Sequence, residues 1–172
     1  MILTHDHILE EMEKKNILIE PLTSNDQIGP ASIDIHLGNL FRRFKTRKAA
    51  LPVREDTNFK EITDYVEIGK DDHLTLEPGE MILGITWEKI TLSESIAGWI
   101  EGRSRFARLG LAVHITSGFI QPGIANHQVL EIANLSPAPL ALYPGVRICQ
   151  IVFERCEGTA RYKGLFQGQD KP

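Results

Sequence analysis

The chain has 172 residues, of which 42% are hydrophobic, and it carries a formal net charge of −4 at pH 7. This length suits one domain with a real core, and the acidic balance disfavours general binding to nucleic acid or membrane surfaces, which usually needs a basic surplus. No apolar run approaches the roughly 20 residues that span a bilayer, and the first residues lack the basic and apolar parts of a signal peptide. We therefore expect a single cytoplasmic domain over residues 1–172.

The first segment has the pattern of a helix. Ile8, Leu9 and Met12 recur at helical spacing after Thr4, which is a candidate N-cap. Acidic residues come early in this segment and lysines come late, as the helix dipole prefers. The pattern predicts an N-terminal helix that docks on the rest of the domain.

From residue 28 onward, short apolar segments are separated by glycine and proline, which is typical of turns between strands. Their spacing favours an antiparallel sandwich or barrel over a βαβ array. A short central helix is predicted over residues 104–109, between Gly102 and Gly110. The predicted strands cover residues 32–37, 81–87, 111–116, 128–133, 140–142 and 147–153. The domain should therefore be mainly β.

Two segments lie outside this pattern. The basic run from Arg42 to Lys48 contains phenylalanines and could form a nucleic-acid patch, but a solvated strand end that runs into a loop is the favoured interpretation. The tail, residues 157–172, is polar and rich in glycine, so we expect it to be mobile until something, such as a ligand, orders it.

The sequence Gly102-Arg103-Ser104 begins the central helix and could bind an anion. A helix start offers unpaired N–H groups, and the arginines nearby add positive charge. Ser104 is placed to cap the helix, and Arg108 lies one turn later on the same face. The alternative, a plain capping serine with solvated arginines, is slightly favoured by this pattern alone.

Glu131 lies within an apolar strand, where an uncompensated carboxylate would be costly. If its face lines a pocket, burial and a nearby arginine would shift its pKa in opposite directions, which is how a general acid/base is tuned. A glutamate on a solvent face is at least as well supported by the sequence. By the same logic, His114 is interpreted as a satisfied strand histidine without a catalytic role.

Several known chemistries lack their sequence signatures here. No histidine is followed two residues later by glutamate, and Cys149 and Cys156 are not spaced as C-x-x-C, so a zinc deaminase is disfavoured and the thiols are expected to stay reduced. Walker, dinucleotide-binding and G-x-S-x-G motifs are also missing.

Taken in order, these segments resemble the dCTP deaminase family, whose fold is the distorted jelly-roll barrel of trimeric dUTPases. The resemblance extends over nearly the whole chain. The similar segments are residues 30–38, 102–111, 114–120, 122–123, 130–134, 143–153, Tyr162 and 166–169. It implies a homotrimer with each site between neighbouring subunits, and a C-terminal lid formed by residues 157–172.

The resemblance also implies a role for each site residue. Glu131 would take a proton from water and deliver protons to cytosine N3 and to the departing amine, while Ser104 and the Ser117 backbone would position that water and Arg108 would orient Glu131. Mg²⁺ would be held by the phosphates of dCTP, without zinc, and dTTP is often a feedback inhibitor in the family. The implied substrate-binding residues are Arg103, Arg105, Gln121, Tyr162, Lys163 and Gln169.

Three positions depart from the family pattern. Arg105 replaces a second serine, so its guanidinium would supply the phosphate contact, and Leu165 replaces a lid lysine, whose contacts Lys163 could make. Gln121 replaces a sugar-contacting aspartate and cannot act as a base. The resemblance therefore implies a dCTP deaminase that releases dUTP and ammonia. The alternatives are a dUTPase, an enzyme that both deaminates dCTP and cleaves the triphosphate to dUMP, a non-catalytic nucleotide-binding trimer, and a jelly-roll module for sugars or proteins.

Overall fold

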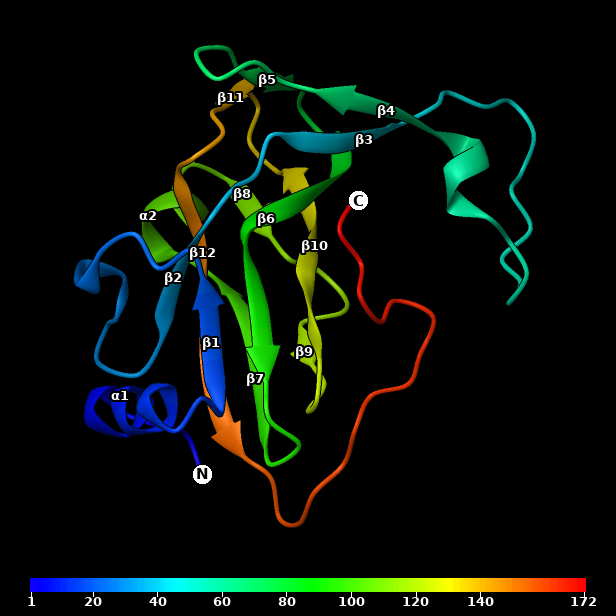
Figure 1. The fold of residues 1–172 in the computed structure, drawn as a ribbon. Coiled ribbons are helices and arrows are strands. Elements are labelled where there is room, and N and C mark those ends of the chain that lie inside the picture. Colours follow the sequence, from blue (N-terminus) through cyan, green and yellow to red (C-terminus); the bar gives the residue numbers. More distant parts are fainter.

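The computed structural model describes residues 1–172 as two α-helices, twelve strands and two short 3₁₀ helices, so the prediction of a mainly β chain with two helices is confirmed (Figure 1). The helices are α1 (His5–Glu13) and α2 (Ser104–Ala107), with η1 (Asn25–Gln27) and η2 (Phe59–Ile62). The strands are β1 (Ile17–Glu20), β2 (Ile33–His36), β3 (Leu40–Phe44), β4 (Thr63–Glu67), β5 (Leu74–Leu76), β6 (Met81–Leu92), β7 (Ile96–Gly102), β8 (Leu111–Val113), β9 (Phe119–Ile120), β10 (Ala125–Asn134), β11 (Leu140–Leu142) and β12 (Arg147–Arg155).

The strands form two main antiparallel sheets. One has the order β4-β3-β6-β10-β8, with β1 also paired to β6, and the other has the order β2-β12-β7-β9; β5 and β11 form a separate ribbon. The sheets do not close into a continuous barrel, so the fold is an open, jelly-roll-like arrangement. A cluster of 27 buried hydrophobic residues forms its core. The long strands β6 and β10 pair along most of their length and position the candidate site.

The N-terminal helix forms where the apolar spacing predicts it. Ile8 is fully buried in the core, and Glu11 is buried with it. Burial raises the pKa of Glu11, but hydrogen bonds from Asn16, Arg155 and Lys14 outweigh it, so the pKa lies below its ordinary value. The paired carboxylate therefore fixes α1 to β12 through Arg155, whose Nη2 lies 2.9 Å from Glu11 Oε1.

Some boundaries differ from the sequence prediction. β8 ends at Val113 rather than at residue 116, because His114 adopts a left-handed backbone conformation with φ of 61° that a strand cannot contain. Ser104 is not the cap of α2: Arg103 occupies the N-cap position, and Ser104 is the first helical residue. The sequence also did not predict β1, β4 and β5.

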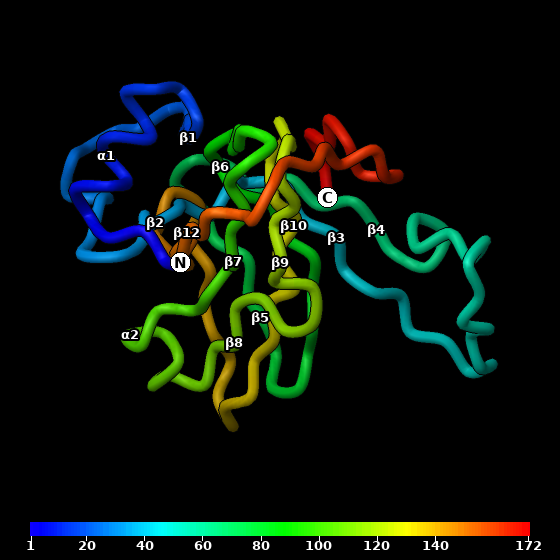
Figure 2. Tube along the Cα trace, turned by 90° about the horizontal axis from the view of Figure 1, so that it is seen from below, coloured from blue at the N-terminus to red at the C-terminus, as the bar shows by residue number.

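Two segments extend beside the main sheets. The basic run ends β3 at Phe44 and continues into an exposed arm between β3 and β4, as the favoured interpretation predicted (Figures 1 and 2). The tail after β12 runs back past β9 to β10, and both views place it beside β10. No helix combines the length and the hydropathy that crossing a bilayer requires.

Candidate active site

A cavity of about 340 Å³ lies where β9 and β10 meet the C-terminal tail. Its wall combines aromatic and aliphatic side chains with neutral amides, and Glu131 has the only acidic side chain in it. The lining residues are Phe59, Leu83, His114, Ser117, Phe119, Ile120, Gln121, Ile124, Asn126, Gln128, Val129, Glu131, Tyr162, Phe166, Gln169 and Pro172. Apolar walls with a few convergent polar groups are typical of small-molecule sites.

Glu131 is held by the segment that follows β8. The backbone N–H of Thr116 donates to Glu131 Oε2 over 2.6 Å, and the Thr116 hydroxyl lies 2.8 Å and 2.7 Å from the two carboxylate oxygens. Because one hydroxyl proton serves one oxygen at a time, the second oxygen keeps free acceptor capacity. The carboxylate is therefore oriented from one side.

The electrostatics of this carboxyl group follow from the same contacts. Burial raises the pKa of Glu131, but the hydrogen bonds from the Thr116 side chain and backbone outweigh it and hold the pKa below its ordinary value. Glu131 is therefore ionised at neutral pH and can accept a proton.

The His114 side chain binds the backbone of Glu131. The backbone N–H of Glu131 donates to His114 Nδ1 over 3.2 Å, so the neutral ring carries its proton on Nε2. That Nε2 atom is buried and has no hydrogen-bond partner. His114 also has a positive φ of 61°, which is uncommon for a residue other than glycine. Residues with such strained backbones cluster at functional sites.

The tail covers the cavity through backbone contacts with β10 and the turn before it. Asn126 Nδ2 donates to the Phe166 carbonyl over 3.0 Å, and the His127 N–H donates to the Gln169 carbonyl over 3.0 Å. The Tyr162 N–H donates to the Pro122 carbonyl over 3.0 Å. These bonds place Tyr162 and Gln169 in the cavity wall.

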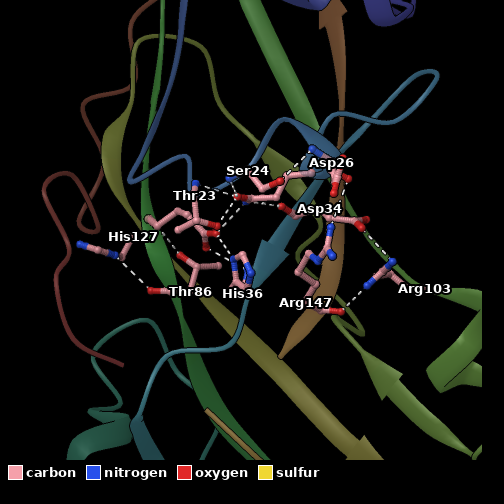
Figure 3. Close-up of polar contacts among 11 residues, drawn as sticks. Thr23, Ser24, Asp26, Asp34, His36, Thr86, Arg103, His127 and Arg147 are labelled. Carbon is pink, nitrogen blue, oxygen red and sulfur yellow. Dashed lines mark hydrogen bonds and ion pairs between the residues drawn. The ribbon is translucent and has the colours of Figure 1, made fainter. Parts of the chain in front are cut away.

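The start of α2 belongs to a different polar cluster. Arg103 Nη2 lies 2.8 Å from Asp34 Oδ2, and its Nη1 donates to the Arg147 carbonyl over 2.6 Å (Figure 3). Burial raises the pKa of Asp34 above its ordinary value, against the opposing charges of Arg103 and Arg147. Arg103 is thus tied to β2 and β12 and does not line the Glu131 cavity.

The structure thus divides the sequence-predicted residues into two groups. Glu131, Ser117, Gln121, Tyr162 and Gln169 line one cavity. The other five lie outside it in the same chain: Arg103, Ser104, Arg105, Arg108 and Lys163. The proposed contacts of this second group with substrate, and the proposed contact of Arg108 with Glu131, stay predictions.

Sequence reasoning missed three polar residues of this region: Thr116, Asn126 and Gln128. The interpretation of His114 as a satisfied strand histidine is wrong, because His114 lies after the end of β8 and its buried Nε2 has no hydrogen-bond partner. Asn126 and Gln128 had a usable signal, because they are polar residues at alternate positions of the strand that leads to Glu131. The contact of Thr116 with Glu131 depends on the turn at His114. Nothing in the local pattern predicts a positive φ for a histidine.

Comparisons with known proteins agree with one another. The dCTP deaminase-like family matches residues 2–156. A protein of Nocardioides sp. named dCTP deaminase, dUMP-forming, is 37% identical over all of this chain and 93% of its own length. A protein of the same name from Methanosphaera stadtmanae is 38% identical over 89% of this chain and 78% of its own length.

The fold is similar to solved structures as well. The crystal structure of 2'-deoxycytidine 5'-triphosphate deaminase from Agrobacterium tumefaciens has a TM-score of 0.70 at 21% identity, covering 90% of this chain, which spans about half (48%) of that one. The dUTPase of Staphylococcus bacteriophage 80alpha has a TM-score of 0.50 at 14% identity, over 87% of this chain and 96% of that chain. The expected dUTPase-like fold is therefore confirmed, and the chain belongs to the dCTP deaminase-like family.

Proposed function

We propose that this protein hydrolyses dCTP to dUTP and ammonia. The observation that carries the proposal is Glu131, the only acidic side chain in a partly apolar cavity, in a chain that belongs to the dCTP deaminase-like family. Its relatives' names supply the substrate.

Glu131 would serve as the general acid/base. It takes a proton from water as the water oxygen attacks C4 of cytosine, and passes that proton to N3. Collapse of the tetrahedral intermediate breaks the C4–N bond, and the second proton of the water leaves with the amine as ammonia. The Thr116 hydrogen bonds support this role because they keep the carboxylate in its proton-accepting form between turnovers.

The remaining roles concern the phosphates and the neighbouring subunit. We infer that the site is completed in a homotrimer by Ser104 and Arg108 of another copy, because both are exposed here and neither lines the Glu131 cavity of its own chain. Arg103, Arg105 and Lys163 would bind the triphosphate. Mg²⁺ would be held by the phosphates of the nucleotide and would neutralise their charge.

The proposal must also say whether the reaction stops at dUTP or continues to dUMP. The relatives' names favour dUMP, which requires a second hydrolysis at phosphorus. The cavity favours dUTP, because position 121 is a glutamine and Glu131 has the only acidic side chain available there as a base. A neutral amide cannot take a proton from a second water.

One assay decides between these products. The protein is incubated with Mg²⁺ and either dCTP or dUTP, and ammonia, dUTP, dUMP and pyrophosphate are measured. Ammonia and dUTP from dCTP, without pyrophosphate from either substrate, is the expected result. Pyrophosphate and dUMP from dUTP would show a second hydrolysis and overturn the dUTP assignment, and no ammonia from dCTP would overturn the deaminase itself.

A further inference from the structure

β10 is irregular at one point beside the cavity. Residues 125–127 pair with residues 91–89 of β6, but Val129 pairs with Ile85, so the three residues 86–88 of β6 lie opposite Gln128 alone. Bulges of this kind are over-represented next to active sites, where they redirect side chains.

The irregularity changes which residues face the cavity. In a regular strand, alternate side chains point to opposite faces, so Asn126 and Glu131 would lie on different faces. Here Asn126, Gln128, Val129 and Glu131 all line the same cavity, including two residues that are adjacent in sequence. This irregularity at Gln128, called the joint below, is a β-bulge that separates the half of β10 that binds the tail from the half that carries Glu131.

Thr86 supplies hydrogen bonds to β10 at the joint, and Figure 3 shows its contact with His127. Its hydroxyl accepts from the Gln128 N–H over 2.9 Å and donates to the Glu88 carbonyl over 2.8 Å. Its own carbonyl accepts from His127 Nδ1 over 3.1 Å. Thr86 is only 2% exposed, so water is not available to replace these partners.

A buried network lies behind Thr86 and limits its movement. Glu88 is fully buried, and its carboxylate accepts from the His36 N–H over 2.9 Å, from Gln27 Nε2 over 3.1 Å, and contacts the His36 ring. Gln27 is in turn fixed by the backbone of Thr23 and Ser24. A buried carboxylate with this many partners has little freedom to rearrange.

We propose that Thr86 is a positioning residue for the deamination proposed above, on which this inference rests. By fixing the joint of β10, Thr86 holds Asn126 on the same cavity as Glu131 and keeps the neighbouring His127 N–H in place to bind the tail. It touches no substrate in this role. It acts through the closure of the tail over the nucleotide.

The test compares Thr86→Val, which removes the hydroxyl and keeps the branched shape, with Thr86→Ser, which keeps the hydroxyl. Thr91→Val is the matched control, because Thr91 lies on the same strand and its side chain makes no hydrogen bond. For Thr86→Val we expect KM for dCTP to rise about tenfold while kcat changes less than about threefold, the signature of lost binding rather than lost chemistry. Thr86→Ser and Thr91→Val should stay close to wild type.

A second readout needs no substrate. Trypsin cleavage after the exposed Arg161 and Lys163 is followed by mass spectrometry in the free protein. Cleavage should be about tenfold faster in Thr86→Val, because undocking of the tail exposes its backbone. If the wild-type protein does not deaminate dCTP, the proposed function fails, while this cleavage rate still decides the role of Thr86.

Three results would overturn the proposal: unchanged KM and cleavage in Thr86→Val, a fall in kcat with unchanged KM, or equal defects in Thr86→Ser and Thr86→Val. If Thr86→Val does not fold, the half-buried His127 tests the same joint. His127→Leu removes the donor to the Thr86 carbonyl and should release the tail, whereas His127→Asn places an amide N–H near Nδ1 and should restore docking. Equal cleavage rates in His127→Leu and His127→Asn would contradict the proposed role of the joint in docking the tail.

Discussion

The Glu131 cavity and the α2 segment carry comparable numbers of predicted site residues, but they are built very differently. The cavity is assembled within one chain, where Thr116 and His114 hold Glu131 and the tail covers it. On α2, Ser104 and Arg108 are exposed and make no side-chain hydrogen bond or ion pair. The difference indicates that the acid/base group is prepared by its own chain, whereas α2 presents its groups outward.

The largest effect should come from the cavity itself. Glu131→Gln keeps the shape of the side chain but cannot accept a proton, so we expect kcat for deamination to fall by about 10³-fold. Binding should survive, and dCTP should still raise the melting temperature of the variant. A variant that keeps its rate would show that the chemistry occurs elsewhere.

The next prediction tests whether α2 serves another copy. Arg108→Ala alone should lose activity by about 10²-fold, since one stabilising charged group is removed. If each site joins Glu131 of one subunit to Arg108 of its neighbour, refolding equal amounts of Glu131→Gln and Arg108→Ala chains together should restore about a quarter of the sites. Separately refolded variants, mixed only afterwards, provide the control. No recovery in the joint sample would place Arg108 in the cavity of its own chain or outside the mechanism.

A smaller effect is expected from the residue that orients the carboxylate. Thr116→Val removes a donor that lowers the pKa of Glu131, so that pKa should rise. The acidic limb of the kcat/KM profile, where Glu131 becomes protonated and inactive as a base, should therefore move to higher pH, with a fall of about tenfold in rate at neutral pH. Thr116→Ser keeps the hydroxyl and should retain the wild-type profile. An unshifted acidic limb in Thr116→Val would assign that limb to a different group.

The Glu131 cavity and the α2 segment also show how much of the fold and of the site the sequence could predict. The mainly β pattern, α1 and the strand position of Glu131 followed from patterning, and the family resemblance pointed to Tyr162 and Gln169, which line the same cavity as Glu131. These are properties that short stretches of sequence retain, because periodicity and turn residues reflect local backbone preferences.

Local sequence patterns could not predict the backbone details that form the cavity. The left-handed backbone of His114, the joint at Gln128 and the docking of the tail on Asn126 all depend on residues distant in sequence. At Ser104, by contrast, a local pattern was present but the prediction made from it was wrong. Its residue type and position suggested a cap, but the chain enters α2 one residue earlier, at Arg103.

The smallest predicted effect concerns this last point and separates structure from function on α2. Because Ser104 is not the N-cap and its hydroxyl makes no hydrogen bond within the chain, Ser104→Ala should change the free energy of unfolding by less than about 0.5 kcal/mol, well below the roughly 1 kcal/mol typical of a lost cap. Thermal or urea unfolding measures this directly.

Gly110→Ala shows that the measurement is sensitive to damage at the same segment. Gly110 has φ of +81°, and a Cβ there would lie 2.6 Å from Ser136 Cβ, so this variant should lose roughly 2 kcal/mol or more. A stable Ser104→Ala protein with reduced deamination would assign the serine hydroxyl to the reaction rather than to the fold. Destabilisation close to that of a lost cap would instead mean that Ser104 supports α2, and that the contrast between the two regions is smaller than the contacts indicate.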